Sequence, residues 1–380
     1  MENNNSCCFV AKINEVRAIE GADNIELVIA GGWNAITKKG EFKEGDLTVI
    51  ATTDAVIPEK LSEKMGVANY LRKGTRVRTV KLRGVYSECL IIPMTYLKGK
   101  VTMGDWDIKE GTDCMGLLGI TKYEPPVKQI QLASGRKIKW RDNQNFHIYY
   151  KFPNLKNVGG MFTEEDTVEI SRKIHGTNAR YGIVKKTKLS FWDKVKKFFR
   201  LADKWINYEY IYGSHNCEKG SDSQGFYSED VWKTIAEKYD IKAKLWKYVK
   251  DTANIVDIGS GIVIYGEIYG AGIQKNYDYG LDDIKFIGFD TTMKGDYNSP
   301  AGTYGAFHSL DLPYIEVLYF GLWNQEVQDK FVFNNFIEGT KVPHEGIVIK
   351  HSSGDRKKVA KVINSDYLIY GEKHDIGDSH

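Results

Sequence analysis

The sequence predicts an α+β protein of two domains, a small N-terminal β-barrel followed by a second β-rich domain with two helices. The chain has 380 residues, more than a typical single domain. Short β-like segments separated by Gly and Asp turns fill residues 8–93, and helical spacing occurs only in two later stretches. With 42% hydrophobic and 27% charged residues, the composition is that of a globular protein.

The N-terminal barrel is predicted from β segments bounded by turn signals such as Gly31-Gly32 and Gly45-Asp46. Short strands with a basic stretch fit an oligonucleotide-binding (OB) barrel, which holds nucleic acid by charge and stacking. A structural β domain without a ligand is the alternative. The expected strands are residues 9–16, 26–29, 47–51, 75–82 and 89–92.

The domain boundaries follow from a change in composition. Residues 119–160 include Pro125-Pro126 and lack a sustained apolar period, so we predict a linker between a module of residues 1–118 and a domain of residues 161–380. In that second domain a capping box of Ser190 and Asp193 opens a helical pattern. We expect its apolar face to pack on its own domain, with RNA or a membrane surface as alternatives. A further helix is predicted over residues 228–249.

Positive charge is concentrated locally, although the net charge is only +3. Six basic side chains and no acidic one lie between positions 72 and 83, and a second basic run covers 194–204. Either stretch is suited to phosphate contact or to a solvated surface. The residues expected to bind nucleic acid are Arg76, Arg78, Lys81 and Arg83.

Several classes of protein are excluded by pattern. The five cysteines include no C-x-x-C pair, so neither a disulfide framework nor a structural zinc is expected. No stretch reaches the roughly 18 apolar residues of a membrane span, and the first residues lack a signal-peptide pattern. We therefore expect a cytoplasmic protein that does not act at a membrane.

The most informative segment is residues 171–180, where Lys173 ends a predicted strand three positions before Gly176. A lysine held there can act as a nucleophile toward a phosphate that approaches the glycine backbone. A surface lysine is the alternative, because K-x-x-G is common by chance.

Four more segments follow in order and supply the remaining chemistry. Glu267 lies in an apolar strand, where a buried acid needs a metal, a hydroxyl or a lysine as partner. Phe286 lies on another strand and is suited to stack on a base. Glu345 and Lys350 belong to a third strand, and Lys361 ends a fourth.

In order and spacing, these segments resemble the motif series of the covalent nucleotidyltransferases, which include ATP-dependent polynucleotide ligases and mRNA capping enzymes. Lys-Ile-His-Gly-Thr-Asn at 173–178 is similar to the RNA ligases in particular, and a barrel placed first is similar to the Deinococcus-type RNA ligases and their phage relatives. The resemblance implies an antiparallel-sheet nucleotidyltransferase domain in an ATP-dependent RNA ligase of RNA repair. It further implies ATP, Mg²⁺ or Mn²⁺, a monomer, and RNA with 3′-OH and 5′-phosphate ends, including nicked duplex.

The resemblance also assigns roles by position. Lys173 would carry AMP, Glu267 and Glu345 would serve the metal, and Lys350 and Lys361 would bind the α-phosphate. Arg172 stands where relatives often have Glu, and His215 where they often have Arg. The nucleotide would be bound by Arg172, Ile174, Asn178, Ser214, His215, Asn216 and, through stacking on adenine, Phe286.

Two rival functions are considered. DNA ligases and capping enzymes usually carry the OB module after the transferase domain, whereas only nineteen residues (380 minus 361) follow Lys361 here. A non-catalytic nucleic-acid-binding protein, in which the barrel does the work, would be favoured if catalytic positions were missing. All of the expected catalytic residues are present, so an RNA ligase is the preferred hypothesis.

Overall fold

The computed structural model describes residues 6–53, 55–98, 108–123, 143–199, 204–215, 218–219, 230–374 and 376. They fall into two compact units. The first takes its described residues from Met1–Val127, Lys156–Gly159 and Ser365–Lys373, and the second from Lys128–Leu155, Gly160–Asn364 and His374–His380.

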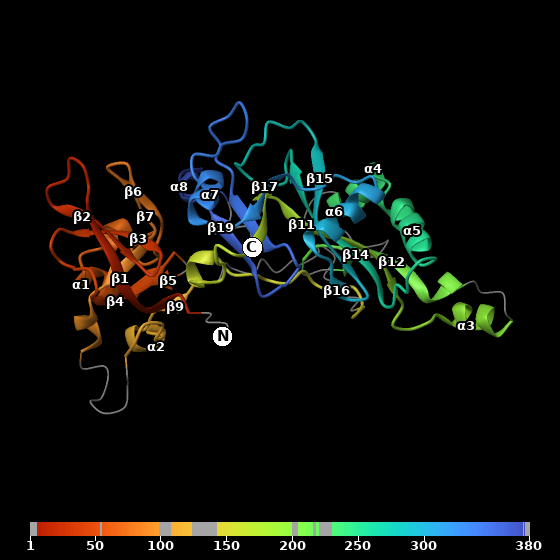
Figure 1. Ribbon diagram of the computed structural model, residues 1–380, viewed down its shortest axis with the longest axis horizontal. Helices are drawn as coiled ribbons and strands as arrows, with labels where there is room; N and C mark the ends of the chain where they lie inside the picture. Colours follow the sequence, from red (N-terminus) through yellow and green to blue (C-terminus); the bar gives the residue numbers. More distant parts are fainter. Residues whose placement is uncertain are drawn as a thin grey trace, which may run out of the picture. The chain divides into compact units, whose positions relative to one another are not determined.

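The first unit is built on a five-stranded antiparallel sheet in the order β3-β2-β1-β4-β8 (Figure 1). The backbone N–H of Glu88, just before β8, donates to the carbonyl of Asn34 in β3 at 2.7 Å, which brings the two edge strands together. The sheet is therefore a nearly closed, OB-like barrel, and the predicted N-terminal fold is confirmed. The strands are β1 (Cys8–Ala18), β2 (Ile25–Ala30), β3 (Trp33–Lys38), β4 (Leu47–Thr52) and β8 (Cys89–Ile92).

Shorter elements complete this unit. Of the predicted strand 75–82 only the last three residues are strand, because the chain turns at Lys73 and bridges Arg72 to Arg76. The elements are β5 (Ala55–Val56), β6 (Val80–Leu82), β7 (Val85–Ser87), β9 (Thr121–Lys122), α1 (Glu59–Lys64), α2 (Met115–Leu118) and the C-terminal helix α8 (Ser365–His374).

The cysteines that the structure describes lie in or beside the two cores of this unit. Cys7, Cys8, Cys89 and Cys114 are buried free thiols, and Cys217 lies outside the described residues. None of the described helices is long and apolar enough to span a membrane.

The second unit contains two antiparallel sheets. The four-stranded sheet has the order β17-β10-β18-β19, and the six-stranded sheet has the order β13-β12-β11-β14-β15-β16. The first comprises β17 (Val317–Leu322), β10 (Thr167–Lys173), β18 (Gly346–His351) and β19 (Val359–Ile363). The second comprises β13 (Glu218–Lys219), β12 (Tyr208–Gly213), β11 (Thr177–Lys185), β14 (Gly261–Gly270), β15 (Ile284–Met293) and β16 (Asp296–Tyr297).

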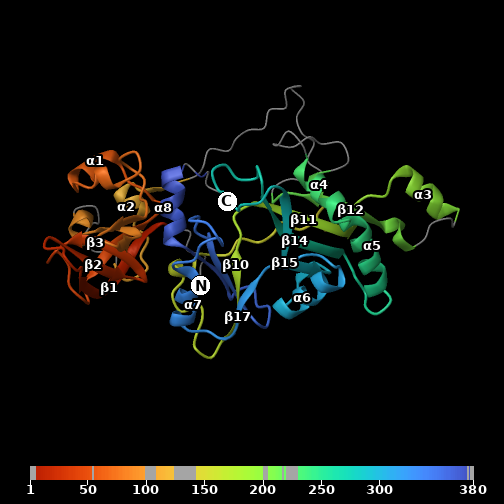
Figure 2. The same ribbon diagram turned by 90° about the horizontal axis from the view of Figure 1, so that it is seen from above.

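Helices cover one face of the six-stranded sheet (Figure 2). Ile235 and Leu245 pack there against strand residues such as Tyr181 and Ile264. The helix predicted over 228–249 is two helices, broken at Asp240, whose φ is 50°. The helices of this unit are α3 (Phe191–Phe198), α4 (Val231–Lys238), α5 (Ile241–Thr252), α6 (Pro300–Ser309) and α7 (Gln325–Val332). Of these, α4, α5 and α6 pack on the six-stranded sheet, whereas α7 packs on the four-stranded sheet.

The other face of this sheet is covered by part of the segment interpreted as a linker. Phe146 and Tyr149 are buried against Val263 and Tyr265 of β14. Residues 143–155 thus belong to the second unit. Their aromatic side chains show no helical or strand period, so the sequence pattern did not identify them as core.

Helix α3 is the largest departure from the sequence-based expectation. Its capping box is present, with Ser190 Oγ accepting from the Asp193 backbone N–H. However, none of its residues is buried, and Trp192 and Phe199 are exposed. The expected packing of its apolar face on the domain is wrong.

Candidate active site

Lys173 is the last residue of β10 and lies opposite Gly346 of β18. In the same register Glu169 faces Lys350, and Val348 lies between Ser171 and Lys361 of β19. Because directly opposed side chains share a sheet face, these polar residues lie on the face away from Ile170 and Ile349, which enter the apolar core. The fold therefore gathers Lys173, Lys350 and Lys361 on one face.

The six-stranded sheet supplies the second group. Asn178 of β11, Glu267 of β14 and Ile287 of β15 form one row across three strands. The charges of both Lys173 and Glu345 act on the carboxyl of Glu267. Lysine 173 and two of the predicted carboxylates thus belong to one site.

A short ion pair lies at the centre of this site. Lys173 Nζ is 2.7 Å from Glu345 Oε1, and the carboxylate is almost fully buried whereas the lysine is 24% exposed. Glu345 directly precedes β18, so strand pairing delivers it beside the end of β10. The pair links the predicted nucleophile to a group able to accept its proton.

Glycine 176 is required by close packing. A Cβ at this position would lie 2.3 Å from the carbonyl oxygen of Ile268 and 2.8 Å from Cγ of Glu267. Its backbone N–H donates to the carboxylate of Glu267. The glycine of the K-x-x-G segment thereby allows the loop after Lys173 to lie against β14.

Residues outside the predicted motifs hold this loop. The backbone N–H of His175 donates to the hydroxyl of Tyr279 at 2.8 Å, and that hydroxyl donates to the His175 carbonyl at 3.0 Å. Gln274 donates to the carbonyl of Gly176, and Tyr277 packs edge-on against the His175 ring. The Gln and Tyr residues come from the β14–β15 connection, and no motif marked them.

Burial sets the protonation of two groups in the site. It raises the pKa of Glu267 to about 8, with Lys173 opposing the rise and Glu345 adding to it. It also lowers the pKa of His175 to about 4, so the imidazole near Glu345 is neutral at pH 7. Glu267 is thus a weakly acidic group that binding of a cation would ionise.

The donor atoms fit a partly hydrated divalent cation. Glu345 Oε2 and Asn178 Oδ1 are buried acceptors for which no hydrogen-bond partner exists in the described part of the chain. Oxygen atoms of this kind are the ligands of Mg²⁺ and Mn²⁺. Within the same residues no three His, Cys, Asp or Glu side chains cluster closely enough to hold a metal, so substrate phosphates or water would have to complete its shell.

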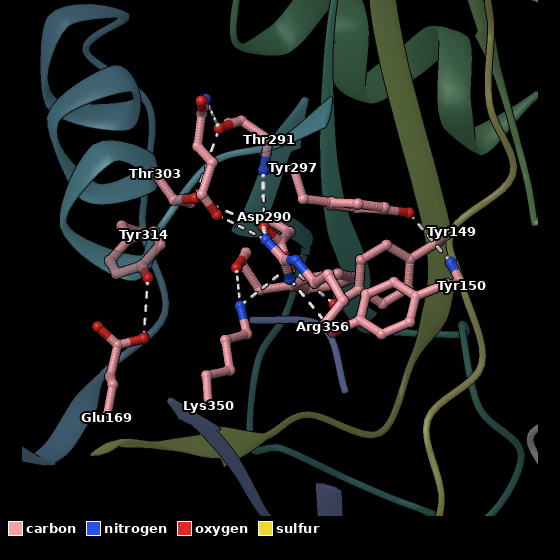
Figure 3. Close-up of polar contacts among 12 residues, drawn as sticks. Tyr149, Tyr150, Glu169, Asp290, Thr291, Tyr297, Thr303, Tyr314, Lys350 and Arg356 are labelled. Carbon is pink, nitrogen blue, oxygen red and sulfur yellow. Dashed lines mark hydrogen bonds and ion pairs between the residues drawn. The ribbon is translucent and has the colours of Figure 1, made fainter. Parts of the chain in front are cut away.

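Lys350 is engaged in a buried network around Asp290 (Figure 3). Its ammonium donates to the Phe289 carbonyl at 2.6 Å and to Asp290 at 3.2 Å. Arg356 binds the same carboxylate with two nitrogens at 2.7 and 3.0 Å, and Tyr149 donates to it at 3.0 Å. Burial alone would raise the pKa of Asp290, but Lys350 and Arg356 hold it below its usual value.

This network differs from the role predicted for Lys350. In the structure the Lys350 side chain is 4% exposed and its ammonium is bound to Asp290. Arg356 pairs with the same carboxylate. Neither Asp290 nor Arg356 was assigned a role from the sequence.

Phe286 does not lie on the face predicted for it. It pairs with Ile268, one position out of register with Glu267, and is 1% exposed in the core beneath α4 and α5. Because a one-residue offset moves a side chain to the opposite face of a strand, Phe286 is unavailable to stack on a base. Phe289 is the partly buried aromatic of this strand that packs with Tyr149 and Tyr265 on the other face.

Arg172 also points away from Lys173. Its guanidinium is paired with Glu316 at 2.9 Å, and its strand position matches Ile347, which enters the apolar core. Alternation along β10 explains this, since adjacent residues face opposite sides. Arg172 therefore lies on the sheet face opposite to that of Lys173.

Three further predicted nucleotide-binding residues, Ile174, Ser214 and His215, are half-buried near the ends of β10 and β12. Ile174 follows Lys173 directly. The carbonyl of Ser214 accepts from Arg180 at 2.9 Å. Burial, with Lys151 and Arg180, lowers the pKa of His215. Asn216 lies outside the described residues.

The predicted nucleic-acid residues all lie in the first unit, and three of them have partners there. Arg76 stacks on the ring of Tyr123, with its guanidinium carbon 3.6 Å from the centroid. Arg78 donates to the Tyr70 carbonyl, and Lys81 donates to the Tyr86 hydroxyl. Helix α8 adds Glu372 near Arg78 and Asp366 near Lys81. Arg83 is exposed at a turn with φ 50°.

Comparison with known families agrees with this architecture. A family model described as RNA ligase matches residues 166–363, which is more than half of the chain. A model described as an OB-fold domain matches residues 8–94. No curated protein sequence matches the chain significantly.

Solved structures show the same fold over nearly the whole chain. A Naegleria gruberi RNA ligase mutant with ATP and Mn has a TM-score of 0.69 at 22% identity and covers 97% of this chain and 99% of its own. A second mutant with AMP and Mn has a TM-score of 0.68 at 21% identity, with the same coverage. The Naegleria ligase with PPi has a TM-score of 0.68 at 22% identity, also covering 97% and 99%.

A strand-end lysine paired with a buried carboxylate between two antiparallel sheets defines a nucleotidyltransferase domain. The matched family model identifies a narrower group within this class. The chain belongs to the RNA ligase family. The closer relation to Deinococcus-type and phage ligases stays a prediction.

Proposed function

We propose that this RNA ligase is ATP-dependent, joins 3′-OH and 5′-phosphate RNA ends, and uses Lys173 as the covalent carrier of AMP. The observation that carries the proposal is the Lys173–Glu345 pair, which lies inside the matched region. The ATP- and AMP-bound Naegleria structures share its fold and support the choice of nucleotide.

In the first step Lys173 Nζ forms a bond to the α-phosphorus of ATP, and the bond to pyrophosphate breaks. An ammonium has no lone pair for attack, so Lys173 must first lose a proton. Glu345, 2.7 Å away, is the nearest carboxylate to accept it. Lys361, on the same sheet face, would bind the phosphate as its charge develops.

Two further displacements complete the reaction. The 5′-phosphate of RNA takes AMP from Lys173, which breaks the N–P bond and forms a pyrophosphate linkage. A 3′-hydroxyl then attacks the 5′-phosphate and releases AMP. A divalent cation at Glu345, Glu267 and Asn178 would supply positive charge to the phosphates.

The test is a label-transfer assay with α-labelled ATP and Mg²⁺. The wild-type chain should retain label after denaturation, and Lys173→Ala should not. Lys244→Ala is the matched control, because Lys244 forms a comparable ion pair outside the site. Its ammonium is 2.9 Å from the carboxylate of Asp311. Label on Lys173→Ala would disprove the assignment.

A second assay separates the chemical steps. Lys173→Ala supplied with pre-adenylylated RNA needs no lysyl-AMP and should still seal it at a reduced rate. Sealing of matched DNA ends at an equal rate would favour the DNA ligase alternative. A preference for RNA ends over DNA ends would suit a role in RNA repair.

A further inference from the structure

Helix α3 has the reverse orientation of an ordinary surface helix, with its polar side toward the domain and its aromatic side toward solvent. Its polar side contacts the domain, since Asp193 pairs with Lys186 at 2.9 Å and Lys197 donates to Asn207 at 2.5 Å. Its aromatic side faces outward. The exposed fractions are 72% for Phe191, 70% for Trp192, 81% for Phe198 and 62% for Phe199.

This orientation is unfavourable unless the aromatic side meets a partner. A large apolar side chain contributes roughly 1.5–3 kcal/mol when buried, and that contribution is absent while the rings are in water. Polar contacts on the inner side hold the helix in this orientation, so the exposure of the aromatic rings follows from these contacts. We call these four exposed side chains the α3 surface: Phe191, Trp192, Phe198 and Phe199.

The charges beside the α3 surface indicate an anionic partner. At 3.6 residues per turn, the exposed residues Lys194 and Lys196 lie on either side of the aromatic stripe. Aromatic rings between cations are the arrangement that binds unpaired nucleic acid, with bases stacked on rings and phosphates on lysines. In a duplex the base faces are already stacked and cannot be used in this way.

We propose that the α3 surface binds an unpaired segment of the RNA substrate. The proposal rests on the RNA ligase function and adds a specificity to it. Lys173 ends β10, and β11 (Thr177–Lys185) begins four residues later and runs toward α3, which lies beyond its far end (Figure 2). At about 3.4 Å per residue β11 spans roughly 27 Å, which equals about eight stacked nucleotides.

The test compares RNA binding by wild type and a variant with Phe191, Trp192, Phe198 and Phe199 all replaced by Ser. The control is Ile255→Ser, which removes an exposed apolar side chain outside α3. We expect the variant to bind a single-stranded RNA of about 20 nucleotides at least about tenfold more weakly, and blunt duplex RNA unchanged. The control should bind both as wild type does, and all three proteins should have the same melting temperature.

Several results would overturn the proposal. These are unchanged affinity for single-stranded RNA, an equal loss for duplex RNA, or loss of binding only to phosphatidylserine vesicles, which would assign the surface to lipid. Lysyl-AMP formation without RNA should be equal in variant and wild type. If wild type itself forms no adduct, the proposed function fails, whereas the RNA-binding comparison still decides the role of α3.

Discussion

Lys173 Nζ and Glu345 Oε1 are 2.7 Å apart, and the carboxylate is the more deeply buried partner. The ion pair holds the ammonium of Lys173 beside the proposed proton acceptor in the absence of ATP. Glu345 directly precedes β18, so the pairing of β18 with β10 sets its position beside Lys173. The reactivity of Lys173 should therefore depend on this single carboxylate.

The first prediction is that Glu345→Gln slows lysyl-AMP formation by about 10²-fold or more, because the amide neither accepts the proton nor attracts a cation. The rate of label transfer at saturating ATP measures this. The control is Glu237→Gln, since that glutamate is 71% exposed on α4 and pairs with Lys233. A rate within threefold (about 0.6 kcal/mol) of wild type would contradict the role.

The second prediction concerns the metal. Glu345 Oε2 and Asn178 Oδ1 lack partners among the described residues, and ATP adds further negative charge. EDTA should therefore stop adduct formation, and Mg²⁺ or Mn²⁺ should restore it. Full labelling in EDTA would disprove the requirement.

The third prediction is that Asp290→Asn destabilises the second unit by about 3–5 kcal/mol, because the buried Lys350 and the half-buried Arg356 lose their carboxylate. Lys350 and Arg356 both bind Asp290 in the structure. Asp257→Asn is the control, since Asp257 is 79% exposed and pairs with Lys294 at 3.8 Å. Urea unfolding measures both, and equal effects would show that the network is not a stability element.

The fourth prediction follows from the raised pKa of Glu267, about 8. The unfolded carboxyl loses its proton near its usual value of about 4.3, so between these values the folded state binds more protons and stability falls as pH rises. Glu267→Gln does not titrate. Its stability relative to wild type should therefore rise between pH 5 and 8, by roughly 1–3 kcal/mol.

Urea unfolding without metal or nucleotide at several pH values measures this difference. Glu237→Gln, on the surface of α4, should show no such trend. A difference between Glu267→Gln and wild type that stays constant from pH 5 to 8 would show that burial does not raise the pKa of Glu267.

The fifth prediction is that replacing Arg76, Arg78, Lys81 and Arg83 together by Ala weakens RNA binding and reduces its salt dependence, while lysyl-AMP formation stays largely intact. Three of these residues have partners in the first unit, so the melting temperature should also fall. Arg83→Ala alone should leave it unchanged. Loss of the adduct with normal sealing of pre-adenylylated RNA would show that the module instead serves the ATP site.

The sequence by itself determined the order of the two folds and which residues form the candidate site. Lys173, Gly176, Glu267 and Glu345 could be found because each lies in a short segment whose residue types and spacing are set by local requirements. Gly176 is an example, since its spacing from Lys173 in the chain was enough to single it out. The contact that requires a glycine there, with the carbonyl of Ile268 on β14, is seen only in the structure.

The tertiary structure alone decided which way side chains face and what they contact. Phe286 misses the face of Glu267 by one register position, and an irregularity between Tyr265 and Gly266 resets the pairing there. Lys350 binds Asp290, which is sixty positions away in the chain. The pattern that predicted α3 as a helix could not tell that its aromatic side would face outward, because orientation depends on the polar contacts of Asp193 and Lys197 with residues outside the helix.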